Sequence, residues 1–334
     1  MSSPPMNQGD PLMSNDIGMS PTGHGEGPPS DTATPGPRPG VCWFSGRGEC
    51  RSTVGSVEEI TIGARGFEFP ALVAGPADGP LIMMLHGLPR NRWEWHHQIP
   101  ALAGLGFRVV APDLRGFSAG ARPEGVDSYH VDEYVADVLA IADMTAGEQR
   151  PFHLMATSIG ASMAWVLAAR HASRVLSLVC INIPHPGALA AASVGRERTP
   201  DDQRERFSYI REARKEGNER AMFEAMLSAQ GVAPAESEPY RRALDDDDVL
   251  RTVFHYYRAL PLWARDRVEP VSVPTTFIWP TGSDNVSPAA IEAMPKWVTG
   301  PYALHVVEDV HQPVLQAAPE VMIELLVAHL AQHA

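Results

Sequence analysis

The chain has 334 residues, of which 44% are hydrophobic, and its formal net charge at pH 7 is −13. This length and apolar content are enough to bury one sizeable core. The negative charge, without any basic stripe, argues against nucleic-acid binding through phosphate contacts. No apolar run approaches the roughly 20 residues of a membrane helix, and none near the N-terminus is long enough for a signal peptide. We therefore expect a soluble, cytoplasmic protein with no membrane partner.

The N-terminal segment differs from the rest of the chain in composition. Its first forty residues hold nine prolines and seven glycines and almost no apolar pattern. Such a segment cannot bury enough apolar surface to offset the entropy of ordering it. We expect residues 1–50 to be a disordered tail. Cys42, Cys50 and Cys180 do not form a disulfide framework, and we expect free thiols.

Strands alternate with a helix in the next part of the chain. A buried strand is predicted at residues 81–85, and it breaks at His86-Gly87-Leu88-Pro89. Taken alone, this break is an ordinary strand end marked by glycine and proline. A second strand and turn follow over residues 107–117. A helical pattern then runs through Val131, Tyr134, Val135, Val138 and Leu139. Strands that alternate with helices indicate a parallel sheet.

Residues 154–161 read Leu-Met-Ala-Thr-Ser-Ile-Gly-Ala, an apolar strand run that becomes a helix at Ser158. Small residues lie two positions before and after the serine, at Ala156 and Gly160. They allow strand and helix to approach closely, and a sharp turn of this kind presents a serine hydroxyl to a histidine and a substrate. The usual pattern has glycine at both positions, and alanine is the smallest departure from it. By itself the motif also fits an ordinary helix N-cap at Ser158.

Several motifs in order carry a resemblance to a known family. They are His86-Gly87-Leu88-Pro89, Trp95-His96-His97-Gln98-Ile99-Pro100, Ala111-Pro112-Asp113-Leu114-Arg115-Gly116, the turn at Ser158, and Asn182-Ile183-Pro184-His185-Pro186-Gly187. The chain resembles the epoxide hydrolase-like branch of the α/β-hydrolase superfamily over about residues 56–332. The resemblance implies an α/β-hydrolase fold, with a mostly parallel central sheet flanked by helices. It also implies a core at 51–186 and 263–334 and a helical cap at 187–262.

The resemblance implies that Ser158 is the nucleophile and that the backbone N–H groups of Leu88 and Ile159 form the oxyanion hole. Relatives in this branch carry aspartate where Ser158 lies. Attack by a carboxylate on an alkyl carbon gives an ester that water can split, whereas attack by serine gives an ether that water does not readily cleave. Attack on a carbonyl gives an acyl-serine that water can hydrolyse. The predicted activity is therefore that of a serine hydrolase acting on a carboxylic ester or lactone.

The catalytic base is expected near the C-terminus, in the run Tyr302 to Pro313, which contains His305 and His311. His311 follows an alternating strand and precedes a final helix that begins near Pro319. The resemblance places the base there. His305 lies inside the predicted strand, where a structural histidine is the better interpretation.

The third member of the triad should be a carboxylate after the strand Thr275 to Trp279. Asp284 is the candidate, and it would accept the imidazole N–H. Relatives place the acid four residues after the aromatic residue, which is Ser283 here, so Asp284 requires a turn that is one residue longer. Asp284 also fits a plain role in a glycine-containing turn, and Asp309 is a poorer second candidate.

More than ninety residues separate the predicted strand Val175 to Ile181 from Thr275, which is far more than an ordinary connection. We expect cap helices at Gln203–Glu216, Asn218–Gln230 and Leu250–Leu262. Epoxide hydrolases have two tyrosines in the cap, and the resemblance maps them to Tyr209 and Tyr257, with Tyr256 as an alternative, as candidates for substrate binding. Trp93, which follows the predicted oxyanion loop, is a further candidate. Each of these aromatic side chains, and Trp95, also fits a packing role. The acidic run Asp245 to Asp248 fits a solvated loop or helix start better than a metal site.

The substrate is thus expected to be a small-molecule ester or lactone, without a metal or an organic cofactor. Two alternatives remain open. The first is a non-hydrolytic enzyme of the same fold, of the cofactor-free dioxygenase or lyase type, because such enzymes also keep a serine and a histidine in these places. The second is a binding protein whose triad no longer turns over. The sequence does not define the oligomeric state.

Overall fold

The computed structural model describes residues 56–194, 202–229, 234–263, 267–311 and 313–333. The predicted tail at residues 1–50 lies outside this part of the chain. Within the described residues, no helix is long and apolar enough to cross a membrane.

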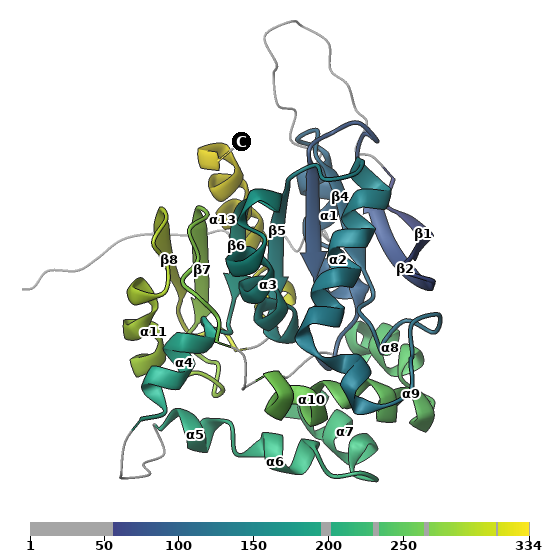
Figure 1. The fold of residues 1–334 in the computed structure, drawn as a ribbon, viewed down its shortest axis with the longest axis vertical. Helices are drawn as coiled ribbons and strands as arrows, with labels where there is room; N and C mark the ends of the chain where they lie inside the picture. Colours follow the sequence, from purple (N-terminus) through teal and green to yellow (C-terminus); the bar gives the residue numbers. More distant parts are fainter. Residues whose placement is uncertain (1–55, 195–201, 230–233, 264–266, 312, 334) are drawn as a thin grey trace, which may run out of the picture. The chain divides into compact units, whose positions relative to one another are not determined.

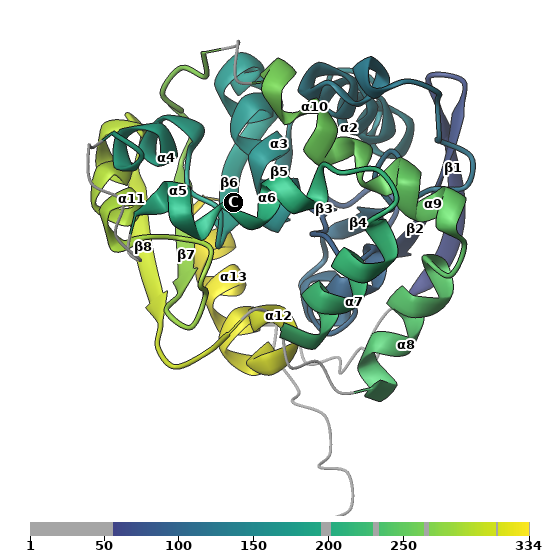
Figure 2. The ribbon, with the colours of Figure 1, turned by 90° about the horizontal axis from the view of Figure 1, so that it is seen from below.

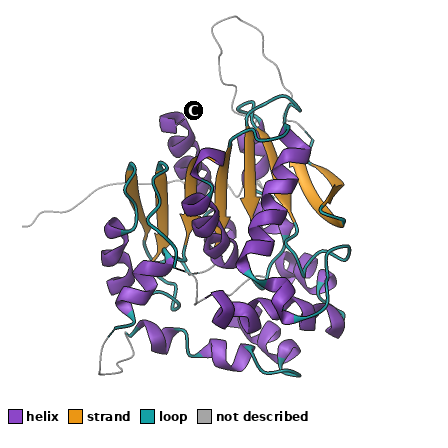
Figure 3. Cartoon of the chain, viewed as in Figure 1, coloured by secondary structure: helices purple, strands orange, loops and turns teal. Residues whose placement is uncertain are grey.

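An eight-stranded sheet forms the centre of the described chain (Figures 1 and 3). Its strands follow the order β1-β2-β4-β3-β5-β6-β7-β8. β1, β2 and β4 pair antiparallel, and the remaining neighbours pair parallel. The strands are β1 (Glu58–Ala64), β2 (Phe67–Ala74), β3 (Leu81–Leu85), β4 (Arg108–Pro112), β5 (Phe152–Thr157), β6 (Val175–Ile181), β7 (Thr275–Pro280) and β8 (Tyr302–Val307). The predicted parallel sheet is confirmed.

Helices cover both faces of the sheet because side chains alternate along each buried strand. Met83 and Leu85 of β3 belong to the apolar cluster of one face, with α2 (Val131–Ala146) and α3 (Ser158–Arg170). Ile82 and Met84 belong to the cluster of the other face. There the sheet packs against α1 (Gln98–Ala103), α12 (Val314–Ala317) and α13 (Pro319–His333).

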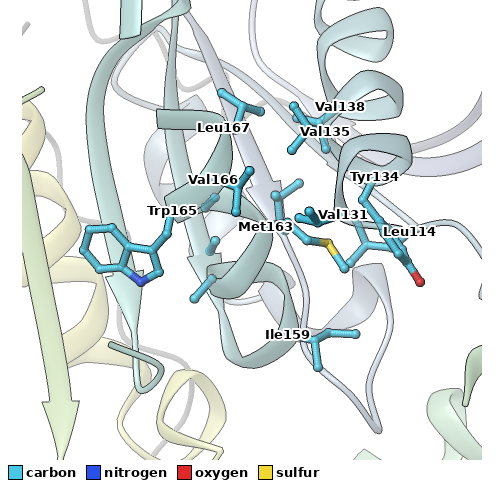
Figure 4. Packing of buried hydrophobic residues seen from close by; sticks show 14 of the residues in the cluster. Leu114, Val131, Tyr134, Val135, Val138, Ile159, Met163, Trp165, Val166 and Leu167 are labelled. Carbon is cyan, nitrogen blue, oxygen red and sulfur yellow. The ribbon is translucent and has the colours of Figure 1, made fainter. Parts of the chain in front are cut away.

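The packing of α2 on α3 fixes the position of the turn at Ser158 (Figure 4). Val131, Val135 and Val138 recur at helical spacing along α2, and all three are buried. They lie on the side of α2 that faces Met163 and Leu167 of α3. The periodic pattern predicted from Val131 onward is therefore a core-facing helix, and the final helix predicted near Pro319 is confirmed as α13.

The described chain between β6 and β7 is mainly helical, and these helices lie beyond the carboxyl ends of the strands (Figures 1 and 2). Its helices are α4 (Pro186–Ala192), α5 (Gln203–Arg206), α6 (Tyr209–Ala213), α7 (Glu219–Ala229), α8 (Pro234–Ala243), α9 (Asp247–Val253) and α10 (His255–Trp263). We use "cap" for α5 to α10. The domain boundaries at 186/187 and 262/263 stay predictions.

The cap helices differ in part from the expected ones. The helix predicted at Gln203–Glu216 is wrong as a single element, because α5 ends at Arg206 and α6 begins at Tyr209, with Phe207 and Ser208 forming a turn between them. The helix predicted at Leu250–Leu262 is likewise divided at Phe254, whose ring is fully buried. The helix α8 was not predicted from the sequence. Asp246 caps α9 by accepting from Asp248 N–H, so the acidic run is a helix start.

The remaining short elements connect the sheet and its helices. They are α11 (Pro288–Ala293) and the 3₁₀ turns η1 (Arg92–Trp95), η2 (Val126–Tyr129), η3 (Ala172–Arg174) and η4 (Met294–Lys296). Of these, η1 matters most for function because it follows the loop that ends β3.

Candidate active site

Ser158 lies at the junction of β5 and α3, with a φ angle of +51°. This left-handed conformation is uncommon for a residue with a side chain and marks a strained turn. The strand and helix can meet because Gly160 has no side chain: a Cβ there would lie 2.7 Å from the carbonyl oxygen of His86. Ala156 fits two residues before the serine, fully buried in β5. The geometry is that of a nucleophile elbow.

The loop after β3 lies directly against Ser158. A Cβ added to Gly87 would lie 2.6 Å from the Cβ of Ser158, so only glycine fits there. Glu94 in η1 anchors the loop, because its Oε2 accepts the Gly87 N–H at 2.7 Å. Glu94 is also paired with Arg90 at 3.1 Å, and both side chains are almost fully buried. This anchor was not predicted from the sequence, because no motif includes Glu94.

The His86 side chain contacts the same loop and the turn after β4. Its Nε2 accepts the Leu114 N–H at 3.0 Å, and its Nδ1 lies 2.9 Å from the Gly87 carbonyl oxygen. Complete burial lowers the pKa of His86, so the ring is neutral and serves as a structural link between β3 and the turn after β4. This is a positioning role and not a chemical one.

Leu88, on this loop, and Ile159, in α3, carry the two backbone N–H groups predicted to form the oxyanion hole. Ile159 is the second residue of α3, and its N–H is among the first four that a helix leaves unpaired. The N–H of Leu88 has no acceptor among the described residues. Both residues line the same cavity as Ser158. The residues predicted to supply the oxyanion donors therefore lie at the same cavity as Ser158, and their role in an oxyanion hole stays a prediction.

His311 lies on the loop after β8 and lines the same cavity as Ser158. Its Nδ1 lies 2.6 Å from the carbonyl oxygen of Gly282, which can only accept a hydrogen bond. Nδ1 therefore carries a proton, and in the neutral ring Nε2 keeps a lone pair. That is the tautomer which a general base needs. Gly282 in turn donates its N–H to the Val310 carbonyl at 3.0 Å, which ties the loop after β7 to the loop after β8.

Asp284 also lines the cavity, but its side chain is exposed. No hydrogen bond within the described residues joins its carboxylate to His311. The cap holds this loop: Arg206 donates to the Asp284 carbonyl at 3.0 Å, and Gln203 binds Asn285 and Ser287 through both ends of its amide. The structure thus brings Asp284 to the cavity without placing its carboxylate on the imidazole.

Ser283 occupies the register position that relatives use for the acid, and it is the buried residue of the turn. Its Oγ has no hydrogen-bond partner among the described residues. Asp309 is exposed, with a φ angle of +56°, and its N–H donates to Thr281 Oγ1 at 3.1 Å. His305 lies within β8 and is partly buried, as expected of a structural histidine.

The cavity has a volume of about 910 Å³ and is lined mainly by apolar side chains. Tyr209 and Tyr257 both line it, with their ring centroids 6.1 Å apart. Burial raises the pKa of each phenol, so both hydroxyls stay protonated. Tyr256 lines it as well, and its hydroxyl lies 3.4 Å from Ser162 Oγ.

Trp93 is not among the lining residues of this cavity. Its side chain is 39% exposed, and its ring stacks on His96 with centroids 4.7 Å apart. Trp95 is fully buried in the core on the α1 side of the sheet. Successive residues of a 3₁₀ turn point in different directions, and the turn directs both rings away from the cavity.

The chain belongs to the alpha/beta hydrolase fold family, which residues 80–310 match. It is 37% identical over 147 residues to epoxide hydrolase B of Mycobacterium tuberculosis, which is 42% of this chain and 40% of that protein. It is 36% identical over 125 residues to the AB hydrolase superfamily protein YfhM of Bacillus subtilis, which is 37% of this chain and 43% of that protein. The chain thus spans about two fifths of the length of these curated relatives.

Solved structures show the same fold. Epoxide hydrolase A of Mycobacterium thermoresistibile superposes with a TM-score of 0.71 at 20% identity, covering 83% of this chain and 98% of that one. An epoxide hydrolase of Vigna radiata, VrEH1, superposes with a TM-score of 0.71 at 24% identity, with the same coverage. The predicted fold class is confirmed.

Proposed function

We propose that this protein is a serine hydrolase that cleaves a carboxylic ester or lactone through an acyl-serine intermediate. The observation that carries the proposal is that Ser158, in its left-handed turn, shares one cavity with His311, whose Nε2 is free to accept a proton. A nucleophile, a base in the right tautomer and two backbone donors are the minimum set for acyl transfer.

The reaction proceeds in two stages. His311 Nε2 takes the Ser158 hydroxyl proton while the oxygen attacks the carbonyl carbon, and the Leu88 and Ile159 N–H groups bind the resulting oxyanion. The tetrahedral intermediate collapses, the alcohol leaves with the proton from His311, and Ser158 is acylated. Water, deprotonated by His311, then attacks the acyl-serine and releases the carboxylic acid.

The relatives named epoxide hydrolases suggest a different substrate, and the identity of the nucleophile argues against it. Opening an epoxide with Ser158 would form an ether between serine and substrate, which water does not readily cleave. Tyr209 and Tyr257 are then best explained as cavity walls or as hydroxyl donors to a leaving group.

The test is hydrolysis of p-nitrophenyl butyrate by the purified protein, together with labelling by a fluorophosphonate and intact mass. We expect turnover and one adduct on the parent, and neither on Ser158→Ala. His311→Ala should lose activity by about a thousandfold or more, as removal of a triad base does in other hydrolases. A folded parent with no adduct would overturn the proposal.

One observation favours a second candidate, a protein of the same fold that binds its ligand in the cavity without turnover. No hydrogen bond or ion pair within the described part of the chain joins the carboxylate of Asp284 to His311, and such a contact supplies the charge that stabilises an imidazolium in a full triad. Ligand binding in the absence of both turnover and a phosphonate adduct would support this candidate.

A further inference from the structure

We propose that the acyl group of the substrate is a linear aliphatic chain of about ten to fourteen carbons that lies along α3. This inference rests on the proposed function and concerns the substrate class of the same site. It begins with four residues of α3 that line the cavity, namely Ser158, Ser162, Val166 and Arg170.

These four residues are spaced by four along the helix, so they form one face of α3. They span thirteen residues, and the twelve steps from the first to the last cover about 18 Å of helix axis at 1.5 Å per step. The cavity is therefore not confined to the serine. It continues along the helix past Val166 as far as the side chain of Arg170, which is ion-paired with Asp132 at the start of α2.

Two other helices form the sides of this corridor. Leu189 and Ala190 of α4 line it on one side, and Leu260 and Trp263 of α10 on the other. Figures 1 and 2 show α4 and α10 on opposite sides of α3. These four wall residues are apolar. Two arginines also line the cavity, and each is paired with a carboxylate: Arg170 with Asp132 and Arg267 with Glu269.

The size of the corridor fits a linear chain. An extended chain advances about 1.2 Å per bond, as the 3.3–3.6 Å reach of a three-bond residue implies. About ten bonds reach from Ser158 to the level of Val166, and about fifteen reach the level of Arg170. Each methylene removed from water into an apolar site adds to binding, so a chain of this length would gain far more than a butyryl group.

The corridor suits the acyl group better than the alcohol because of where His311 lies. His311 precedes α12, which packs in the cluster on the α1 and α13 face of the sheet, whereas α3 packs in the cluster of the opposite face. The leaving alcohol must meet His311 Nε2 to receive its proton. The part of the substrate that extends away from His311 along α3 is then the acyl chain.

The experiment compares p-nitrophenyl butyrate, octanoate and laurate below their micelle-forming concentrations, so that only the acyl chain changes. We expect kcat/KM to rise at least tenfold from butyrate to laurate. Val166→Phe, which fills the middle of the corridor, should lower laurate turnover at least tenfold and change butyrate turnover less than threefold.

Val166 is buried, so a phenylalanine there can also impair folding. A second variant at an exposed position separates this effect from a narrowed corridor. Ala190 of α4 is exposed and lines the corridor, so Ala190→Phe should narrow it without disturbing the core. The matched control is Ala191→Phe, because Ala191 is exposed on the same helix but is not among the lining residues. Ala190→Phe should reproduce the selective loss on laurate, and the control should not.

Two results would overturn the inference without affecting the proposed serine hydrolase activity. One is an active parent whose kcat/KM does not change with acyl-chain length, and the other is equal losses on butyrate and laurate in both corridor variants. If the parent neither turns over nor forms an adduct, the proposed function fails, and the corridor is tested by fluorescence of bound cis-parinaric acid. Binding that laurate displaces but butyrate does not, and that Ala190→Phe weakens at least tenfold, would support the corridor. No binding would overturn it.

Discussion

The imidazole of His311 donates its Nδ1 hydrogen to the main-chain carbonyl of Gly282 across 2.6 Å. A carbonyl fixes the tautomer and orientation of the ring as a carboxylate would, but it brings no full negative charge to stabilise the imidazolium. The base is thus oriented by the fold of two loops, which are further joined by Gly282 N–H and the Val310 carbonyl.

The first prediction concerns the carboxylate of Asp284. Because it is exposed and makes no hydrogen bond to His311 in the described chain, Asp284→Asn should change kcat/KM for p-nitrophenyl butyrate by less than about threefold. A loss of a hundredfold or more would restore Asp284 as the triad acid and would require the loop to rearrange during catalysis.

The second prediction concerns the neighbouring position. Ser283 is buried, its Oγ lacks a partner among the described residues, and it follows the residue that holds His311. A carboxylate there would supply the missing charge, so Ser283→Asp should raise kcat for the same ester by about tenfold. Ser283→Asn is the matched control without charge and should give no increase. An equal effect of both variants would argue against this explanation.

The sequence predicted the parts of the site that depend on local pattern. Ser158 was found because a nucleophile elbow needs an apolar strand, small flanking residues and a helix in a fixed order, and His311 because it follows the strand that became β8. The choice between Ser283 and Asp284 could not be made in this way. One residue in a turn decides which side chain is buried, and contacts from Gln203 and Arg206, about eighty positions away, fix that turn.

Long-range packing also explains what else the sequence did not predict. The corridor along α3 has a local signal, the spacing of Ser162, Val166 and Arg170 from Ser158, but its walls come from α4 and α10. The exclusion of Trp93 depends on how η1 turns against the core. Neither the corridor walls from α4 and α10 nor the orientation of η1 produces a periodic pattern in the sequence from which it could be predicted.

The third prediction concerns the buried pair of Arg90 and Glu94, which anchors the loop at Gly87, next to Leu88. Removing one charge of a buried pair is strongly destabilising, so Glu94→Gln should lower the free energy of unfolding by about 3 kcal/mol. Urea denaturation would measure this. The control is Glu212→Gln, which breaks an exposed pair with Lys215 and should change stability by less than about 0.5 kcal/mol. Similar losses of unfolding free energy in Glu94→Gln and Glu212→Gln would show that the buried pair stabilises the protein no more than the exposed pair does.

The fourth prediction concerns the phenols of the cavity. If Ser158 and His311 perform the chemistry, the hydroxyls of Tyr209 and Tyr257 need not activate the substrate. Tyr257→Phe and Tyr209→Phe should each keep kcat within about threefold of the parent on p-nitrophenyl butyrate. A loss of a hundredfold in kcat with an unchanged KM would instead assign the affected hydroxyl to the transition state.

The fifth prediction concerns stability in acid and rests on a buried polar network remote from the cavity. Ser177 Oγ lies 2.8 Å from both His153 Nδ1 and His329 Nε2, and Thr276 Oγ1 lies 2.8 Å from His329 Nδ1. Burial lowers the pKa of His153 to about 4 and that of His329 to about 3, and the nearby His333 adds to both effects.

Both histidines bind protons more readily in the unfolded chain, where the pKa is about 6.5. The free energy of unfolding therefore rises with pH below about 6.5. The contribution of the two histidines is fully present above about pH 6.5 and declines as the pH falls toward 4 and 3. Each histidine should cost about 2 kcal/mol of the free energy of unfolding between pH 7 and pH 5. His329→Gln can keep hydrogen bonds to Ser177 and Thr276 but does not titrate. Urea denaturation at the two pH values should show a loss about 2 kcal/mol smaller in this variant than in the parent, and equal losses would mean that His329 is not the group that titrates.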